Sequence, residues 1–273
     1  NSDHVLTRSV RDSAAALDQS AGPVRGSRYH VRPEVGSYLA MLEEKPPKLR
    51  IGVSTSTPYG DSVGKNQEAS VERVSTALAD MGHEIDEYAY PADLGLGSWM
   101  EDLWMVDVAY EIDNRVKEVG REPLHEELEA LTHFVRERVA SLSAMDLYRA
   151  RQGAHEASMR LMNSMSEFDL VLTPTLGSDP IPVGYMDSRT ANFNMETWGE
   201  RGHAFAPFAY ICNVSGQPAA SLPVQLKDGE HPCAVQLAGH TGKDHLILQV
   251  AAELEKEFGW HQYRPPIWAG DLQ

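Results

Sequence analysis

The residues best suited to chemistry in this chain stand where two segments are expected to turn. Residues 173–175 (TPT) follow a buried strand, and residues 213–216 (NVSG) form a tight turn before a strand that contains Pro. Ligands of α/β proteins bind at the carboxyl ends of strands, so the side chains of Thr175 and Asn213 are candidates for holding a polar substrate. A strand terminator and a structural turn would explain the same residues, and both interpretations stay open.

Several common catalytic and binding patterns are absent from the sequence. There is no G-x-S-x-G nucleophile turn, no H-E-x-x-H motif or Cys/His cluster of the kind that binds zinc, and no phosphate-loop pattern in residues 52–65. We therefore expect no metal site and no cofactor. Cys212 and Cys233 are interpreted as small, buried hydrophobic residues that stay reduced.

The order of helical and strand patterns predicts an α/β fold, with a mixed β-sheet flanked by helices in one body over residues 1–273. Residues 49–89 form a predicted β-α-β unit, in which the two strands are parallel. The expected strands are 49–54, 85–89, 168–173, 219–225 and 234–237, and the expected helices include 9–20, 67–81 and 244–258.

Two long segments connect these elements. Residues 98–167 are predicted to form three helices, with breaks at 120–123 and at 141–143, where Ser143 is a plausible helix cap. Residues 181–201 show no periodicity, and we expect a long, turn-rich loop there.

Composition limits the partners of the chain. The formal net charge is −16, which argues against nucleic acid, because phosphate-binding surfaces need clustered Lys and Arg. No apolar run approaches the roughly 18 residues that would span a membrane. Without a signal peptide, we expect a cytoplasmic protein, and the polar start at residues 1–4 is typical of the inside of a longer polypeptide.

Four separated blocks, in this order along the chain, are similar to the amidase signature family. They are LTRSVRDSAAALD at 6–18, FDLVLTPT at 168–175, NVSGQPAASLP at 213–223, and VQLAG at 235–239 running into GKD at 242–244. The small and Pro residues of the third block let a backbone pass close to a neighbour. The segment FAPF at 205–208 resembles bacterial amidases related to cyclic-dimer (nylon oligomer) hydrolases.

The resemblance implies hydrolysis of a carboxamide C–N bond by a Ser-cis-Ser-Lys triad. A serine attacks the carbonyl carbon, a bridging serine and an unprotonated lysine relay its proton, and backbone N–H groups of a Gly/Ser-rich loop hold the oxyanion. In the family this loop and the lysine precede the first block. No G-G-S-S-G-G run exists in this chain. The resemblance therefore implies a fragment, the C-terminal portion of an amidase, with no catalytic residues and no activity alone.

Two local groups of residues are weak substitutes for the triad, and neither is expected to form a self-contained active site. They are Ser54, Ser56 and Thr57 with Lys65, and Ser215 and Ser221 with Lys227. By position and chemistry, the candidate substrate-binding residues are instead Trp104, Asp107, Thr175, Phe205, Phe208 and Asn213.

The expected partners are a small-molecule amide substrate and a complementary N-terminal amidase part. A homodimer is a further candidate assembly. The missing part predicts a large exposed apolar face on this chain. The main alternative is a non-catalytic binding or assembly module with an amidase-like half fold. A subunit of an amidotransferase that serves transfer RNA is a third possibility, against which the acidic charge counts.

Overall fold

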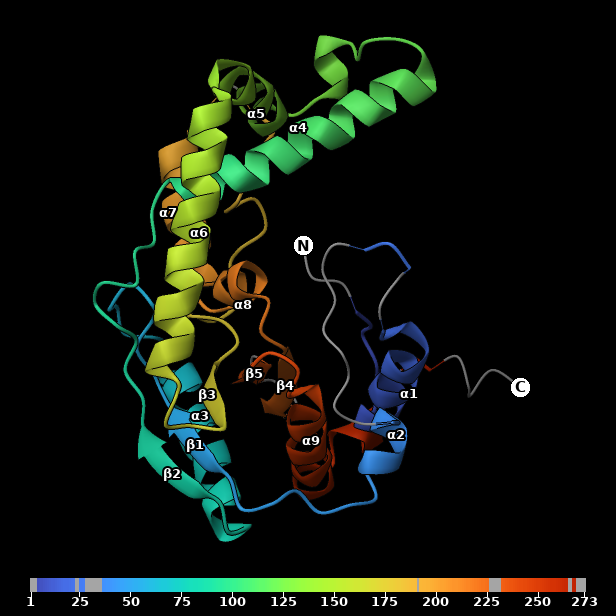
Figure 1. Ribbon diagram of the computed structural model, residues 1–273, viewed down its shortest axis with the longest axis vertical. Coiled ribbons are helices and arrows are strands. Elements are labelled where there is room, and N and C mark those ends of the chain that lie inside the picture. The colour runs from blue at the N-terminus through green and yellow to red at the C-terminus, as the bar shows by residue number, and fades with distance from the viewer. Residues whose placement is uncertain are drawn as a thin grey trace.

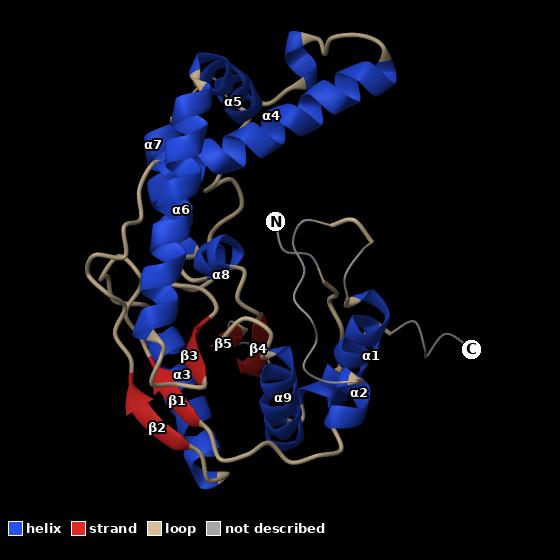
Figure 2. Ribbon diagram, in the orientation of Figure 1, coloured by secondary structure: helices blue, strands red, loops and turns tan. Residues whose placement is uncertain are grey.

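The computed structural model describes residues 4–22, 25–27, 36–190, 192–225, 232–264 and 267–268. A five-stranded sheet carries helices on both faces, and a helical arm extends away from it (Figures 1 and 2). The strands are β1 (Arg50–Val53), β2 (Glu84–Glu87), β3 (Leu170–Pro174), β4 (Ala219–Gln225) and β5 (Cys233–Gly239). The helices are α1 (Val10–Ser20), α2 (Tyr38–Met41), α3 (Lys65–Asp80), α4 (Trp99–Val119), α5 (Ala130–Ser141), α6 (Ala144–Ser164), α7 (Met195–Phe205), α8 (Ala209–Ser215) and α9 (Asp244–Phe258), with 3-10 turns η1 (His125–Glu127) and η2 (Trp260–Gln262).

The sheet is mixed, with the strand order β2-β1-β3-β5-β4. Strands β2, β1 and β3 are parallel, whereas β5 runs antiparallel to both β3 and β4. The predicted mixed α/β fold and the parallel β-α-β unit of β1, α3 and β2 are thus confirmed. Strands β1 and β3 are parallel, so their carboxyl ends lie at the same end of the sheet. Ser54 and Thr175, which follow these strands, therefore lie at that end. The expectation of a single body over the whole chain stays a prediction.

Side chains of β3 and β5 alternate between two hydrophobic layers. Leu170, Leu172 and Leu237 join the larger core, which contains residues of α1, α2, α3 and α9. Val171 and Ala238 point to the opposite face, where residues of α6 and α8 cover them. The period of two in a strand produces this division, so helices must bury both faces of the central strands.

The arm consists of the three helices predicted between residues 98 and 167, which are confirmed as α4, α5 and α6. Helix α4 ends at Gly120, whose φ of 76° is left-handed, and it packs against both α5 and α6. Helix α6 starts with a capping box, in which Ser143 and Asp146 each satisfy the other's backbone N–H. Figure 1 shows α4 projecting from the arm with its C-terminal end far from the sheet.

The expected loop over residues 181–201 is wrong in its last part, because α7 begins at Met195. Asn194 caps this helix, and its side chain accepts a hydrogen bond from the backbone N–H of Thr197 at 2.9 Å. Only Gly199 of α7 is buried. Two glycines, which are poor helix formers, lie inside this 11-residue helix, and they weakened the helical signal in the sequence.

The expected tight turn at residues 213–216 is also wrong, because Asn213 and Ser215 belong to helix α8. Gly216, with a φ of 70°, ends the helix, and its N–H donates to the carbonyl oxygen of Cys212 at 2.9 Å. This is a glycine helix terminus of the usual left-handed kind. The helix buries Ile211 and Cys212, which leaves Asn213 on its exposed side.

Candidate functional site

The end of strand β3 touches the edge strand of the sheet. The N–H of Thr175 donates to the carbonyl oxygen of Ala234 at 3.0 Å, which continues the pairing with β5 by one residue. The Thr175 hydroxyl lies 2.8 Å from the hydroxyl of Ser221 on β4. Thr175 is half-buried and Ser221 is exposed. Two hydroxyl groups are therefore held together at the carboxyl end of a central strand.

The backbone of Gly177, two residues after Thr175, is hydrogen-bonded to residues at the start of helix α3 and the end of helix α7. Its N–H donates to the carbonyl oxygen of Phe205 at 2.8 Å, and its own carbonyl oxygen accepts from Gly64 at 2.8 Å. A Cβ atom on Gly177 would collide with the carbonyl oxygen of Ala204. Only glycine permits this close approach, so the segment after β3, the start of α3 and the end of α7 are held together.

Three polar aromatic side chains meet beside this junction, and we call Tyr59, His203 and Tyr210 the aromatic cluster. The ring centroid of Tyr59 lies 5.1 Å from that of His203 and 5.9 Å from that of Tyr210, and the last two are 5.7 Å apart. The cluster joins the loop after β1 to helices α7 and α8. Such rings offer apolar faces together with polar atoms, which suits an amide ligand.

Two buried donors beside these helices lack a hydrogen bond of normal geometry among the described residues. They are the indole N–H of Trp198 and the hydroxyl of Tyr210, which interacts with the hydroxyl of Tyr59. Trp198 stacks on Trp104 of α4, with ring centroids 6.1 Å apart and ring planes 15° apart. An unpartnered buried donor costs about 1–3 kcal/mol, so each marks a position where a ligand or another polypeptide can accept a hydrogen bond.

Charge near the aromatic cluster comes from Glu101 in the first turn of α4, which lies against Gly199 of α7. Burial lowers the pKa of His203, and Glu101 opposes this shift. Burial, followed by the neighbouring Tyr59, raises the pKa of Tyr210 above its usual value. The cluster therefore favours a neutral imidazole and a protonated phenol, both of which can donate a hydrogen bond.

We predict that the stability of the chain depends on the charge of His203. Because its folded-state pKa is lowered, the neutral ring stabilises the fold above the unfolded pKa of about 6.5, and this contribution is lost as pH falls through the folded-state pKa. In urea unfolding at several pH values between 5 and 8, His203→Phe should flatten the loss of stability on the acid side. Glu101→Gln should lower the pKa of His203 further, because the Glu101 carboxylate opposes the effect of burial. If His203→Phe loses as much stability at acid pH as the parent chain, the pH dependence does not come from His203.

The two cysteines are buried and unpaired with each other, as predicted. Burial raises the pKa of the Cys212 thiol to about 12, and its sulfur accepts a hydrogen bond from the side-chain amide of Gln236 at 3.6 Å. A thiol protonated at neutral pH is a poor nucleophile. Cys212 is therefore part of the packing beneath the site.

The residues expected to bind substrate lie in different settings. Trp104 is partly exposed and stacks on Trp198, while Asp107 is exposed further along α4. Phe205 is half-buried at the end of α7, whereas Phe208 has no exposed surface and lies 6.4 Å from Tyr90, centroid to centroid. With Thr175 at the end of β3 and Asn213 exposed on α8, the six come from four elements. Their assignment as substrate-binding residues stays a prediction.

Sequence patterns missed Tyr59, Trp198, His203 and Tyr210, which the fold gathers beside the same helices. These residues come from the loop after β1, from the unpredicted helix α7 and from α8. Their contacts join segments far apart in sequence, and single aromatic residues carry no spacing signal.

The serine and lysine groups weighed as local substitutes for a triad have structural contacts or fall outside the described residues. The Ser54 hydroxyl donates to the carbonyl oxygen of Ser56 at 3.2 Å and accepts from its N–H. Thr57 accepts from the backbone of Tyr59 and Asp61. Both patterns are typical of turns, and Lys227 is not among the described residues.

Within the described ranges, no group of three or more His, Cys, Asp or Glu side chains is placed to hold a metal ion. Across the same part of the chain, no helix is both long enough and apolar enough to cross a bilayer.

Comparison with known proteins finds relatives over nearly the whole chain. This chain is 31% identical to the 6-aminohexanoate-cyclic-dimer hydrolase of Pseudomonas sp. (strain NK87), and the match covers 96% of this chain and 55% of that protein. The hydrolase of the same name from Paenarthrobacter ureafaciens is 29% identical, with the same coverage. A solved structure of a 6-aminohexanoate cyclic dimer hydrolase superposes with a TM-score of 0.85 at 28% identity, over 94% of this chain and 55% of the other.

The chain thus spans about half the length of the curated relatives that it matches. The family model described as Amidase matches residues 2–248. This match covers all four sequence blocks and every element from α1 to β5. The chain belongs to the amidase family.

Proposed function

We propose that this chain supplies the scaffold and the substrate-binding side of an enzyme that hydrolyses a carboxamide C–N bond. The observation that carries the proposal is the 31% identity with a cyclic-dimer hydrolase, which extends over 96% of this chain. The triad then belongs to the part of the relatives' length that this chain does not span, which we call the complementary part. The chain alone is inactive, since it lacks the Gly/Ser-rich loop that the chemistry needs.

Within the assembled enzyme, residues of this chain bind and orient the amide. The substrate pocket includes Trp104, Asp107, Thr175, Phe205, Phe208 and Asn213, with the aromatic cluster and Trp198 beside them. Aromatic faces take up apolar methylene groups, while the buried donors of Tyr210 and Trp198 reach a carbonyl oxygen of the substrate. Holding the amide in place lowers the entropic cost of attack by a serine of the complementary part.

The names of the relatives and the aromatic residues near the candidate site support a proposal for the substrate class. The relatives are named for the cyclic dimer of 6-aminohexanoate, an uncharged amide with aliphatic linkers. The rings of Tyr59, Tyr210, Trp104 and Trp198 lie in two pairs and offer apolar faces of the kind that contact such linkers. We therefore propose a small aliphatic carboxamide as substrate. The expectations of a cytoplasmic location and of a homodimer stay predictions.

The test is an activity assay of the chain with and without its complement. The purified chain should release no amine from the cyclic dimer or from simple aliphatic amides above the uncatalysed rate. Co-expression with the complementary part of a cyclic-dimer hydrolase should give hydrolysis that co-purifies with both polypeptides. Enzyme-like turnover by the chain alone would contradict the missing triad. A stable complex that never hydrolyses an amide would support the non-catalytic module instead.

A further inference from the structure

Glu101, in the first turn of helix α4, has no hydrogen bond and no ion pair among the described residues. Its neighbour Asp102 differs, because Arg138 of α5 donates to both oxygens of that carboxylate, at 2.9 and 3.1 Å. The start of a helix favours negative charge, which accounts for an acidic residue at either position. It does not account for the half-buried carboxylate of Glu101, since a charged group removed from water needs a partner.

The Glu101 carboxylate faces helix α7 and the aromatic cluster. Its Oε1 atom lies 3.7 Å from the position that a Cβ on Gly199 would occupy. Gly199 and His203 are four residues apart and share one face of α7, and Tyr59 packs on His203. Burial is the main cause of the pKa shift of each ring, raising the pKa of Tyr59 and lowering that of His203, and the Glu101 carboxylate raises both. The carboxylate is therefore close enough to act on both rings.

Aromatic rings lie near this carboxylate on both helices. Trp104 follows Glu101 by one helical turn on α4 and stacks on Trp198 of α7, while Tyr59 and Tyr210 stack on each other. Trp104 and Tyr59 are exposed, at 37% and 41%, so a small ligand can reach them from solvent. The faces of Trp and Tyr rings attract cations. Together with an unpaired carboxylate, they offer the contacts that an alkylammonium ion requires.

Two basic side chains of the described part, Arg138 and His203, interact with Glu101, and neither neutralises it. The Arg138 guanidinium is already held by Asp102 through its two hydrogen bonds. The lowered pKa of His203 leaves its ring neutral at neutral pH. The formal net charge of −16 attracts cationic ligands to the chain. The negative charge of Glu101 is therefore available to a cation from solution.

We infer that Glu101 selects a substrate whose carboxamide carries a protonated amine at the far end of an aliphatic linker. The ammonium group binds beside Glu101, against the faces of Trp104 and Tyr59, while the amide is presented to the complementary part. The inference rests on the proposed function and narrows its substrate class from small aliphatic carboxamides to aminoalkyl carboxamides. Glu101 determines specificity and takes no part in the cleavage itself.

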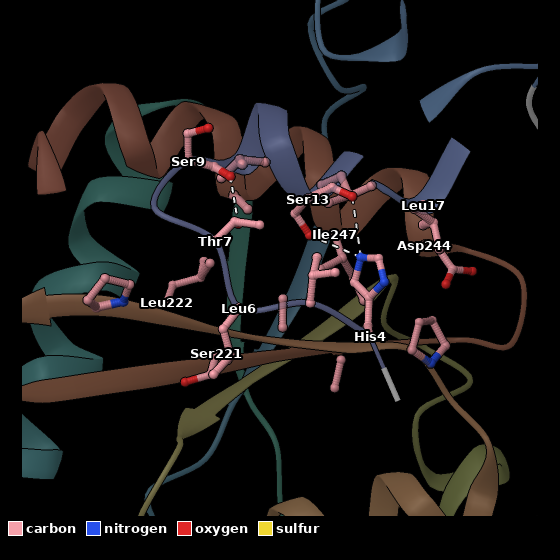
Figure 3. Close-up of a pocket in the computed structure, with 18 of the residues that line it drawn as sticks. His4, Leu6, Thr7, Ser9, Ser13, Leu17, Ser221, Leu222, Asp244 and Ile247 are labelled. Carbon is pink, nitrogen blue, oxygen red and sulfur yellow. Dashed lines mark hydrogen bonds between the residues drawn. The ribbon is translucent and has the colours of Figure 1, made fainter. Parts of the chain in front are cut away.

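A second carboxylate must be distinguished from Glu101 in any test with a cation. A groove of about 1180 Å³ lies between β4, helix α1 and the start of α9. Figure 3 shows Asp244 among the side chains that line this groove, together with Leu6, Leu222 and Ile247. The test therefore includes a variant at Asp244, which separates binding in this groove from binding at the aromatic cluster.

The first measurement is the binding of hexylammonium to the purified chain, followed by tryptophan fluorescence, with hexanol as the uncharged probe. Hexylammonium should bind at least about tenfold more tightly than hexanol, because it gains the carboxylate and the ring faces. Glu101→Gln should remove this difference, since it keeps the size of the side chain and deletes its charge. Glu111→Gln, the same change at an exposed position of α4, and Asp244→Asn should retain it. Equal binding of the two probes, or loss of the difference in Asp244→Asn alone, would overturn the inference.

Turnover by the co-expressed pair provides the second readout. The probes are 6-aminohexanamide and heptanamide, which differ only in an ammonium group against a methyl group, and ammonia release gives kcat/KM for each. The ratio should favour 6-aminohexanamide at least about tenfold and fall towards one in Glu101→Gln, but not in Glu111→Gln. Equal hydrolysis of both amides by the parent pair would overturn the inference and leave the proposed function standing. Binding of hexylammonium that depends on Glu101, in a pair that hydrolyses no amide, would support the ammonium site and overturn the proposed function.

Discussion

Replacing Leu237 by alanine is expected to lower the free energy of unfolding by about 2–5 kcal/mol, the range for leucine-to-alanine changes in a closed core. Leu237 has no exposed surface and lies opposite Leu172 in the register of β5 with β3. Side chains from helices on the same face enclose it in the larger core. Because a domain is stable by only about 5–15 kcal/mol, this single cavity removes a large share of the total.

Urea unfolding followed by circular dichroism measures this loss. The matched control is Leu124→Ala, because the same atoms are deleted from a side chain that is 55% exposed. It should change stability by no more than about 0.5 kcal/mol. Equal losses in the two variants would mean that the sheet and its helices do not form the tightly packed core described here.

The elements with strong periodic signals could be predicted from sequence. Strand β4 and helix α9 have the bounds that were expected, Ala219–Gln225 and Asp244–Phe258. Buried Leu222 and Val224 alternate in β4, and buried Ile247, Val250 and Leu254 recur at helical spacing in α9. The partner of each strand, in contrast, follows from tertiary packing. No local pattern indicates that β5 lies between β3 and β4.

The candidate site was less accessible to sequence patterns. Thr175 was found because a strand end has a local signature, and its contact with Ser221 is a consequence of strand order. The aromatic cluster depends on where α7 and α8 lie relative to the loop after β1. Its residues are separated by more than 140 positions in the sequence at the widest, from Tyr59 to His203 and Tyr210. Contacts between residues so far apart in sequence can be identified only once the fold is known.

Replacing Tyr210 by phenylalanine is expected to separate function from stability. The Tyr210 hydroxyl is buried and interacts with the hydroxyl of Tyr59, but it makes no hydrogen bond of normal geometry among the described residues. Removing it should therefore change the stability of the chain alone by less than about 1 kcal/mol. If the hydroxyl donates to the substrate amide, the same change lowers kcat/KM of the assembled enzyme about tenfold, the equivalent of one lost hydrogen bond.

Tyr88→Phe is the matched control, because the Tyr88 hydroxyl lies 2.8 Å from the hydroxyl of Ser164. This variant should lose about 1 kcal/mol of stability through its broken hydrogen bond and keep its kcat/KM. The two tyrosines therefore predict different patterns, since the hydroxyl of Tyr88 has a hydrogen bond of normal geometry inside the chain and that of Tyr210 does not. A Tyr210→Phe enzyme that loses stability but hydrolyses amides at the parent rate would show that this hydroxyl supports the fold and does not contact the substrate.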